Sequence, residues 1–390
     1  MTVTETNHLP AALITPPTLP SYLSDADTAR READLRALPL QRIIAYGMEL
    51  GDAMLLRSLV ENGADWTEAG EALAERALAL LADPATAPTP ATRRVSLQRA
   101  SACLRLSQIV LYRDDQRRKA IFQRSTELFE QSVAHDPRYT RLHIPHPKGA
   151  LHGWWIRAVP APRGGAATVL VVGGMEGWAD DHHEAAAVLL ERGLDVVLID
   201  GPGQGITRMS NGHYLDDAFA AAYQTVIDHM VGELGITHPI GLWGNSMGGN
   251  LVMHVASADP RVAACVNNGG GAQLAKLVSR RRTFEKMECM CGPVDSGADQ
   301  DVDRVVAATA LDESNVTLRC PLLVVHAGED QLIAREDMTV LYDLAPSDDK
   351  TLCTFEDAEH CVYRHPAEKY AVITDWLHSR LAGSGALPGL

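Results

Sequence analysis

The feature that most constrains this chain is the regular alternation of short apolar runs with helical stretches between residues 138 and 381. The apolar runs are rich in Val, Leu and Ile and are bounded by turns, as buried strands are. We expect strands at 141–144, 151–158, 168–172, 194–199, 240–243, 262–266, 321–326 and 351–355, and helices at 181–192, 215–233, 248–256, 336–344 and 366–381. This order predicts an α/β fold in which helices cover both faces of a mostly parallel sheet.

The rest of the chain differs in character from this region. Residues 21–137 show helical periodicity and almost no β-branched runs, which predicts a helical N-terminal domain that acts as a cap or a dimerisation surface. Segment 272–316 interrupts the alternation with polar sequence, as an inserted lid would. Residues 1–20 and 382–390 are expected to be tails. The helices of the N-terminal domain are expected at 40–61, 66–81, 92–112 and 114–134.

Composition and charge exclude several classes of protein. Hydrophobic residues make up 46% of the chain and charged residues 22%, which excludes a disordered or collagen-like chain. No apolar run reaches the roughly 18 residues of a membrane-spanning helix, and residues 1–7 lack the basic and apolar regions of a secretory signal. The net charge of −15 would repel nucleic acid and anionic membranes. Seven scattered Cys residues predict reduced thiols in the cytoplasm.

The strongest chemical signal is the sequence Gly244-Asn245-Ser246-Met247-Gly248-Gly249, which lies between an expected strand and an expected helix. G-x-S-x-G in that setting is typical of a nucleophile elbow, in which a serine occupies a sharp, strained turn. Small residues are needed two positions before and after the serine because the backbones approach closely there. We therefore expect Ser246 to be a nucleophile above the carboxyl edge of the sheet, and not part of an ordinary glycine-rich loop.

A serine hydroxyl becomes a good nucleophile only beside a base that an acid orients. In this architecture the order along the chain is serine, acid, histidine. Asp330, which follows the strand at 321–326, is predicted to be the acid, and its neighbour Glu329 is the alternative. His360, which follows the last strand, is predicted to be the base, and His365 is its local rival.

Backbone N–H groups are needed to stabilise the negative charge that develops on an attacked carbonyl oxygen. The N–H of Met247, at the start of the helix after the serine, is the first candidate. The glycine-rich loop 173–177 supplies the second, for which we choose Met175 N–H, with Gly174 N–H next. Neither this loop nor the loop 200–205 has the G-x-G-x-x-G spacing of a dinucleotide site, and no cofactor is predicted.

A zinc site and an anion site are the remaining chemical hypotheses. The cysteines and histidines between residues 353 and 365 could share a zinc ion only if a strand end and a loop folded back on each other. The sequence therefore predicts no metal. The run Arg280–Arg282 in the expected lid is interpreted as a solvated face, with contact to an acidic or phenolate substrate as the alternative.

Several motifs occur together in this chain. They are the long helical N-terminal region, Gly173-Gly174-Met175-Glu176, Asp200-Gly201-Pro202-Gly203-Gln204-Gly205 and Gly244-x-Ser246-x-Gly248-Gly249-Asn250. Residues 138–381 thereby resemble the α/β-hydrolase fold, and the chain is similar to the family that contains 2,6-dihydroxypseudooxynicotine hydrolase and the FrsA-like esterases. The resemblance implies a Ser-His-Asp enzyme that can cleave a carbon–carbon bond beside a ketone, and it implies a homodimer. Related sequences occur in aromatic catabolism and polyketide tailoring.

The resemblance also implies an acidic lid residue beside the substrate. Glu285 and Glu288 are the candidates for that residue. The further candidates for contact with a small-molecule substrate are Glu176, Trp178, Tyr214 and Met290. Core packing is the alternative role of Trp178, Tyr214 and Met290.

Three functions fit these residues. The first is a hydrolase that cleaves a carbonyl-adjacent bond, a ketone carbon–carbon bond or an ester or lactone, in a small aromatic or polyketide-like molecule. The second is an acyltransferase or cyclase that uses the same triad in a pocket that excludes water. The third is a non-catalytic binding protein of hydrolase shape, which we expect to have lost a triad residue, and here none is lost.

Overall fold

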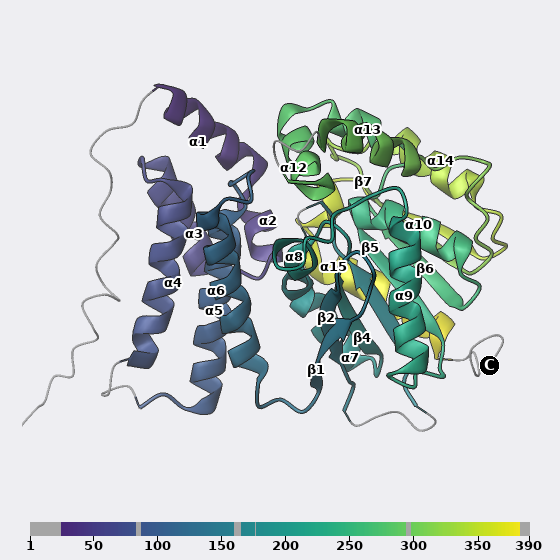
Figure 1. The fold of residues 1–390 in the computed structure, drawn as a ribbon, viewed down its shortest axis with the longest axis horizontal. Helices are drawn as coiled ribbons and strands as arrows, with labels where there is room; N and C mark the ends of the chain where they lie inside the picture. The colour runs from purple at the N-terminus through teal and green to yellow at the C-terminus, as the bar shows by residue number, and fades with distance from the viewer. Residues whose placement is uncertain (1–24, 83–86, 160–164, 176, 294–297, 383–390) are drawn as a thin grey trace, which may run out of the picture. The chain divides into compact units, whose positions relative to one another are not determined.

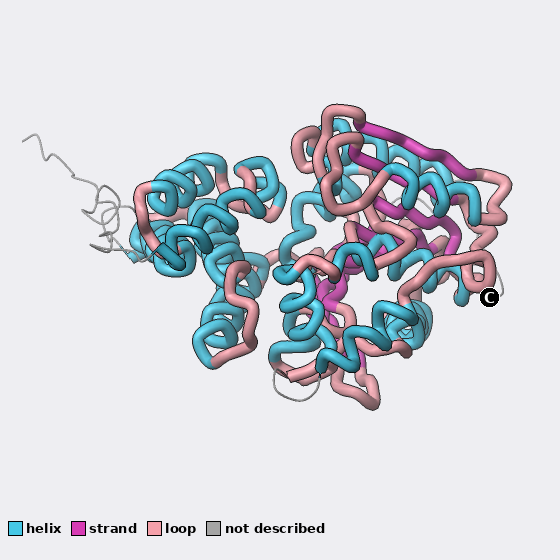
Figure 2. The backbone as a smooth tube through the Cα atoms, turned by 90° about the horizontal axis from the view of Figure 1, so that it is seen from above, coloured by secondary structure: helices cyan, strands magenta, loops and turns pink. Residues whose placement is uncertain are grey.

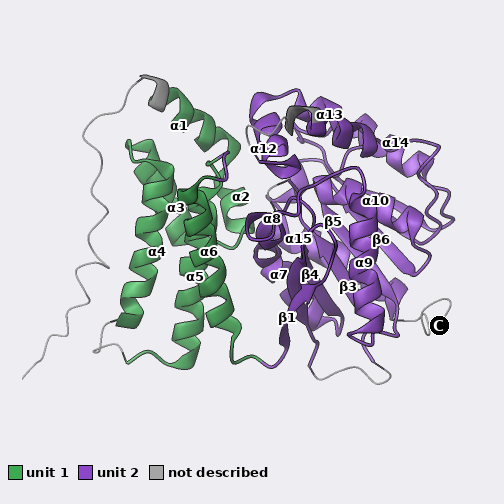
Figure 3. Ribbon diagram, in the orientation of Figure 1, with its two compact units in different colours: residues 1–111, 115–136 green, residues 112–114, 137–390 purple. Residues whose placement is uncertain are grey.

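The computed structural model describes residues 25–82, 87–159, 165–175, 177–293 and 298–382 (Figure 1). Residues 1–20 and 383–390 of the expected tails lie outside the described residues. The chain divides into two compact units (Figure 3). One unit comprises the chain up to Leu111 together with Asp115–Asp136, and the other comprises Tyr112–Asp114 and the chain from Pro137 onward.

The first unit contains helices and no strands in its described residues (Figure 2). Helix α5 packs against both α4 and α6, and α4 approaches α5 closely at Gly70, where a Cβ atom would lie 2.5 Å from Ser107 Cβ. The single helix expected at 40–61 is two helices, because the chain turns at Gly47 with φ 86°, a conformation that favours glycine. The helices are α1 Asp25–Ala37, α2 Leu40–Ala45, α3 Leu50–Glu61, α4 Trp66–Ala82, α5 Pro90–Gln108 and α6 Gln116–Val133.

Tyr112–Asp114, between α5 and α6, belong to the second unit, which the helical pattern around them did not indicate. The Arg282 guanidinium of α12, Arg281–Cys291, lies 5.8 Å from the centre of the Tyr112 ring. Arg208, whose side chain is 1% exposed, forms an ion pair with Asp114 at 3.1 Å. These side-chain contacts, rather than the local pattern, account for the grouping.

The second unit contains, in its described residues, one eight-stranded sheet in the order β1-β2-β4-β3-β5-β6-β7-β8. Strand β2 runs antiparallel to both β1 and β4, and all the other pairs are parallel. Residues of β3 and β7 are buried along the whole strand, as expected for a sheet covered on both faces. The strands are β1 Tyr139–Ile144, β2 Leu151–Ile156, β3 Thr168–Val172, β4 Asp195–Asp200, β5 Ile240–Asn245, β6 Val262–Asn268, β7 Leu322–Ala327 and β8 Lys350–Phe355.

Helices cover both faces of this sheet (Figure 1). Helix α10 packs against β5, β6 and α9, and α14 packs against β7 and β8. Helix α15 packs against β5, β6 and α7 on the opposite face. The predicted α/β fold is thus confirmed. These helices are α7 His183–Glu191, α8 Gly205–Met209, α9 Phe219–Gly232, α10 Met247–Ala258, α14 Arg335–Leu344 and α15 Pro366–Leu381.

The segment expected to be a lid is a helical insertion between β6 and β7. It contains α11 Ala275–Val278, α12 and α13 Ala298–Ala308. The two ends of the insertion are tied together, because Asn250 of α10 donates from Nδ2 to Gly271 O at 3.0 Å and to Thr309 O at 2.9 Å. The insertion therefore starts and ends beside the helix that follows Ser246.

Candidate active site

Ser246 lies between the end of β5 and the start of α10 with φ 54° and ψ −126°. This strained conformation is rare for residues other than glycine. Its neighbours have no room for side chains, because a Cβ on Gly244 would lie 2.1 Å from Gly248 O and a Cβ on Gly248 would lie 2.4 Å from both Gly173 O and Val172 O. The turn that carries Ser246 is therefore wedged directly against the end of β3.

Three of the predicted residues form one chain of hydrogen bonds. His360 Nε2 lies 2.8 Å from Ser246 Oγ, and His360 Nδ1 lies 2.7 Å from Asp330 Oδ2. The other oxygen of Asp330, Oδ1, accepts from the backbone N–H groups of Leu332 at 2.8 Å and Ile333 at 3.0 Å. Ser246, Asp330 and His360 follow β5, β7 and β8, so parallel pairing brings all three to the carboxyl edge of the sheet.

Burial and hydrogen bonds together determine the direction of the pKa shifts of Asp330 and His360. Burial of Asp330 opposes ionisation, but hydrogen bonds from His360 and from the backbone outweigh it and lower the pKa of the carboxyl group. Burial also opposes protonation of His360, but the neighbouring Cys361 and the Asp330 carboxylate raise the pKa of the imidazole. An ionised Asp330 accepts from Nδ1–H, which leaves Nε2 free to accept the Ser246 hydroxyl proton.

The alternative acid and base residues point elsewhere. The Glu329 side chain is 54% exposed and forms an ion pair with Arg364 at 2.8 Å. His365 precedes α15 and lies 3.1 Å from Asp357. Neither residue therefore belongs to the hydrogen-bonded chain that contains Ser246.

Asn268 is a site residue that the sequence did not reveal. It is fully buried at the end of β6, where its backbone O accepts from Ser246 N at 2.8 Å. Its Nδ2 donates to Asn245 Oδ1 at 2.8 Å and, at 3.5 Å, to the backbone O of Cys361, the residue after His360. Asn268 thus connects the turn of the serine to the turn of the histidine. An asparagine at a strand end has no pattern that would announce such a role.

The turn after His360 is itself strained. Cys361 and Val362 have φ values of 58° and 56°, in the left-handed region that β-branched residues rarely occupy. Both side chains are buried, and Cys361 Sγ donates to Asn268 O at 3.5 Å. The surrounding packing therefore holds the histidine turn in a conformation that the isolated chain would avoid.

The start of α10 and the loop 173–177, which are predicted to stabilise an oxyanion, both lie beside Ser246. Met247 is the first residue of α10, where N–H groups have no acceptor within the helix. Gly174 lies against the serine, since a Cβ on Gly174 would be 2.9 Å from Ser246 Cβ. Met175 is half-buried next to it.

The candidates for substrate contact lie in different environments. Glu176 lies outside the described residues. Trp178 is buried and Tyr214 is half-buried, with the pKa of Tyr214 raised by burial and by Asp114. Glu285 and Glu288 are half-buried on α12, and Glu285 forms an ion pair with Arg281 at 2.9 Å.

Met290, the remaining candidate, is fully buried in the main hydrophobic cluster. Its backbone O accepts from Leu215 N at 2.7 Å. Packing of α12 onto the second unit is therefore the role that these contacts support.

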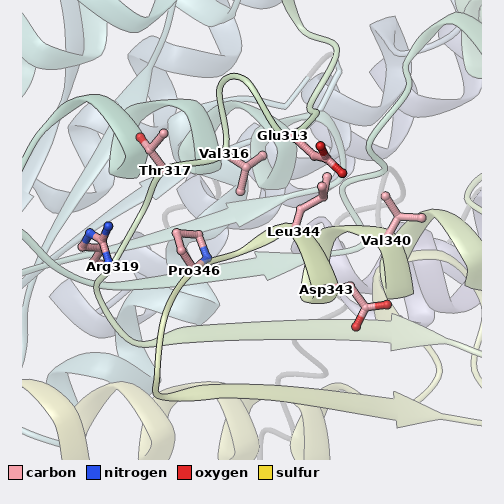
Figure 4. A pocket seen from close by; sticks show the side chains of 8 residues that line it. All are labelled: Glu313, Val316, Thr317, Arg319, Val340, Asp343, Leu344 and Pro346. Carbon is pink, nitrogen blue, oxygen red and sulfur yellow. The ribbon is translucent and has the colours of Figure 1, made fainter.

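A surface groove of about 600 Å³ is lined by none of these residues (Figure 4). Its lining comes from α14 and from the loops that lead into β7 and β8, so it lies where these parallel strands begin. The groove therefore lies on the opposite edge of the sheet from Ser246. It is lined by Glu313, Val316, Thr317, Arg319, Val340, Asp343, Leu344 and Pro346.

The described ranges hold neither a metal cluster nor a membrane-spanning helix. No group of three or more His, Cys, Asp or Glu side chains is placed there to hold a metal ion. None of the helices described is both long and apolar enough to cross a membrane. All seven cysteines are free thiols.

Comparisons with known proteins identify the fold. A family model for the alpha/beta hydrolase fold matches residues 167–288. The crystal structure of 2,6-dihydroxy-pseudo-oxynicotine hydrolase aligns with a TM-score of 0.75 at 21% identity, covering 90% of this chain and 98% of that one. The chain has the α/β-hydrolase fold. A second solved structure, of wild-type AbyA5, aligns to this chain with a TM-score of 0.66 at 17% identity, over 93% of this chain and 96% of that one.

Two curated relatives refine the resemblance. The chain is 25% identical over 296 residues to 2,6-dihydropseudooxynicotine hydrolase of Paenarthrobacter nicotinovorans, covering 75% of this chain and 78% of the relative. It is 30% identical over 255 residues to hydrolase LUC6 of Fusarium sp, covering 60% of this chain but only 59% of the relative. The expected resemblance to the 2,6-dihydroxypseudooxynicotine hydrolase family is confirmed.

Proposed function

We propose that this α/β hydrolase is a serine enzyme in which Ser246 is the nucleophile, His360 the base and Asp330 the acid that orients it. The observation that carries the proposal is the continuous hydrogen-bonded chain, 2.8 Å from serine to histidine and 2.7 Å from histidine to aspartate. The strained Ser246 turn supports the same role, because strain of this kind concentrates at active sites.

The chemistry begins when His360 Nε2 accepts the Ser246 proton while Ser246 Oγ bonds to a substrate carbonyl carbon. The carbonyl π electrons move to the oxygen, and the N–H groups of Met247 and Met175 donate hydrogen bonds to it. Each such donor is worth about 10²–10³ in kcat. The imidazolium then returns the proton to the leaving group, and water activated by His360 hydrolyses the acyl-enzyme.

The substrate class rests on the leaving group. In an ester or a lactone the leaving group departs through an oxygen atom. In a ketone the leaving group departs through a carbon atom and must form a stabilised carbanion, as in a β-diketone or an acyl-phenol. Relatives named for 2,6-dihydropseudooxynicotine and for 20-hydroxy-prefusarin support a small aromatic or polyketide-like substrate.

The insertion α11–α13 borders this substrate as a lid in the proposed enzyme. Arg280, at the start of α12, donates to Gln331 O beside Asp330. At its other end, α12 contacts Leu215 through Met290 O. The insertion thus contacts loops at the carboxyl edge of the sheet, where open α/β sheets bind ligands.

The test is the mass of the intact protein after exposure to a fluorophosphonate probe. Wild type should gain one adduct, Ser246→Ala should gain none, and Ser257→Ala should label like wild type, because Ser257 lies at the far end of α10 and its Oγ accepts from Thr317 N. An adduct that persists in Ser246→Ala would contradict the proposal. Rates on short esters, β-diketones and acyl-phenols then identify the bond that is cleaved.

A further inference from the structure

Gln204 is a buried side chain whose hydrogen bonds all go to backbone groups of two loops. It is 1% exposed and precedes α8 in the turn after β4. Its Oε1 accepts from Gly201 N at 3.0 Å. Its Nε2 donates to Gly173 O and to Gly174 O, both at 2.8 Å. One amide group therefore connects the 200–205 turn to the loop beside Ser246.

Those two bonds determine the direction of the neighbouring N–H groups. In a planar trans peptide the C=O and the N–H point in opposite directions. Gly174 O is held by Gln204 and also accepts from Gly177 N at 3.0 Å. The N–H of Met175, which belongs to the same peptide unit, must therefore point away from Gln204.

Gly174 faces the serine. A Cβ on Gly174 would lie 2.9 Å from Ser246 Cβ and 3.5 Å from Ser246 Oγ. Gly177 occupies the space beside the other candidate donor, since a Cβ there would lie 2.8 Å from Gly174 N. These contacts favour Met175 N–H as the donor on the serine side.

We propose that Gln204 is a positioning residue that fixes the Gly174–Met175 peptide unit with its N–H toward the oxyanion. The proposal rests on the function proposed above. Glycine permits rotation of an adjoining peptide unit at low cost, so a loop with Gly173 and Gly174 needs an external constraint. Without the Gln204 amide, the peptide unit can turn and present its carbonyl oxygen, which repels an oxyanion.

The experiment compares two substitutions with a matched control in the full-length chain. Gln204→Leu removes the amide, and Gln204→Glu keeps its size and its acceptor for Gly201 N–H but replaces the Nε2 donor with oxygen. Gln224→Leu is the control, because Gln224 also donates from Nε2 to a backbone oxygen, that of Ala258, but lies on α9. Kinetics are measured with 4-nitrophenyl butyrate.

The expected result is a loss in kcat of about 10- to 100-fold in both Gln204 variants with little change in KM, and no change in Gln224→Leu. Affinity for a trifluoromethyl ketone, which forms an oxyanion on the serine, should fall by a similar factor. Affinity for the matching methyl ketone should stay constant. A role in folding alone would lower Tm and leave kcat and this difference in affinity unchanged.

Gln204→Glu adds a pH readout and covers the case in which Gln204→Leu does not fold. A protonated carboxyl group can donate to one of the two carbonyl oxygens, whereas an ionised one repels both. The ratio of variant to wild-type kcat should therefore fall as pH rises. A constant ratio, or wild-type kcat in a folded Gln204 variant, would overturn the positioning role and leave the proposed function intact. Absence of Ser246-dependent turnover in wild type would overturn both.

Discussion

At the scale of single residues, the role of a side chain in this site depends on where it points and not only on its chemical type. Asp330 and Glu329 are adjacent carboxylates, but the Asp330 side chain is fully buried against His360 while Glu329 is more than half exposed. Desolvation strengthens the interaction of Asp330 with the imidazole, whereas the Glu329–Arg364 pair is screened by water. Only the first pair can control the protonation of His360.

This difference predicts the pH dependence of the reaction. His360 acts as a base only when neutral, and its pKa is raised, so kcat/KM should rise with pH through an inflection above about 6.5. Asp330→Asn removes the charge that favours the imidazolium. It should shift the inflection to lower pH and reduce kcat by about 10³- to 10⁴-fold, as measured in pH–rate profiles.

Glu329→Gln is the matched control for that profile. It removes an adjacent carboxylate that bonds Arg364 and not His360, so both the inflection and kcat should match wild type. If Glu329→Gln shifts the inflection and Asp330→Asn does not, the acid has been assigned to the wrong residue.

Among secondary-structure elements, the contact between α10 and the end of β3 matters most. Gly248 O and Gly249 N leave no space for a side chain at Gly244, and Gly173 O and Val172 O leave none at Gly248. The helix that carries Met247 N–H is thereby held against the loop that carries Met175. Small residues around the serine are thus a packing requirement between elements.

Gly248→Ala should therefore destabilise the protein. The new methyl group would lie 2.4 Å from two backbone oxygens, which cannot move without shifting β3. The free energy of unfolding should fall by about 1–3 kcal/mol or more. Gly232→Ala at the end of α9 has no atom within 4 Å and should stabilise by about 0.5–1 kcal/mol. Urea unfolding measures both, and equal effects would contradict the steric argument.

At the scale of the whole molecule, the chain carries a net charge of −15, and Arg280, the first of three consecutive arginines, donates to Gln331 O beside Asp330. The negative net charge repels an anionic substrate, whereas the arginines attract it. Overall charge is felt over a Debye length of about 10 Å at 0.1 M salt, and the arginines act locally.

The predicted homodimer and cytoplasmic location stay predictions.

We expect the overall charge to dominate, because Arg281 and Arg282 are already engaged with Glu285 and with the Tyr112 ring. kcat/KM for a 4-nitrophenyl ester that carries a carboxylate should then rise as salt increases from 10 to 150 mM, as screening weakens the repulsion. The neutral 4-nitrophenyl butyrate serves as the control and should not respond. A fall in kcat/KM for the anionic ester would instead indicate that the arginines attract the substrate.

Features encoded in neighbouring residues could be predicted from the sequence alone. Strand β3 spans Thr168–Val172 and helix α15 spans Pro366–Leu381, at the residues expected from the apolar runs and the helical pattern. The turn at Ser246 was also predicted, because its glycines are a local requirement. Local patterns sufficed where propensity and periodicity point to one structure.

Only the tertiary structure decided what depends on residues far apart in the sequence. The sequence favoured Asp330 over Glu329, but which carboxylate meets His360 depends on the turn after β7 and on its pairing with β8, which side-chain type does not encode. The roles of Asn268 and Gln204 can be recognised only in the structure, where β6 contacts the turn after His360 and the 200–205 turn contacts the loop after β3. Buried polar groups must find partners, and sequence alone does not say which backbone groups folding brings to them.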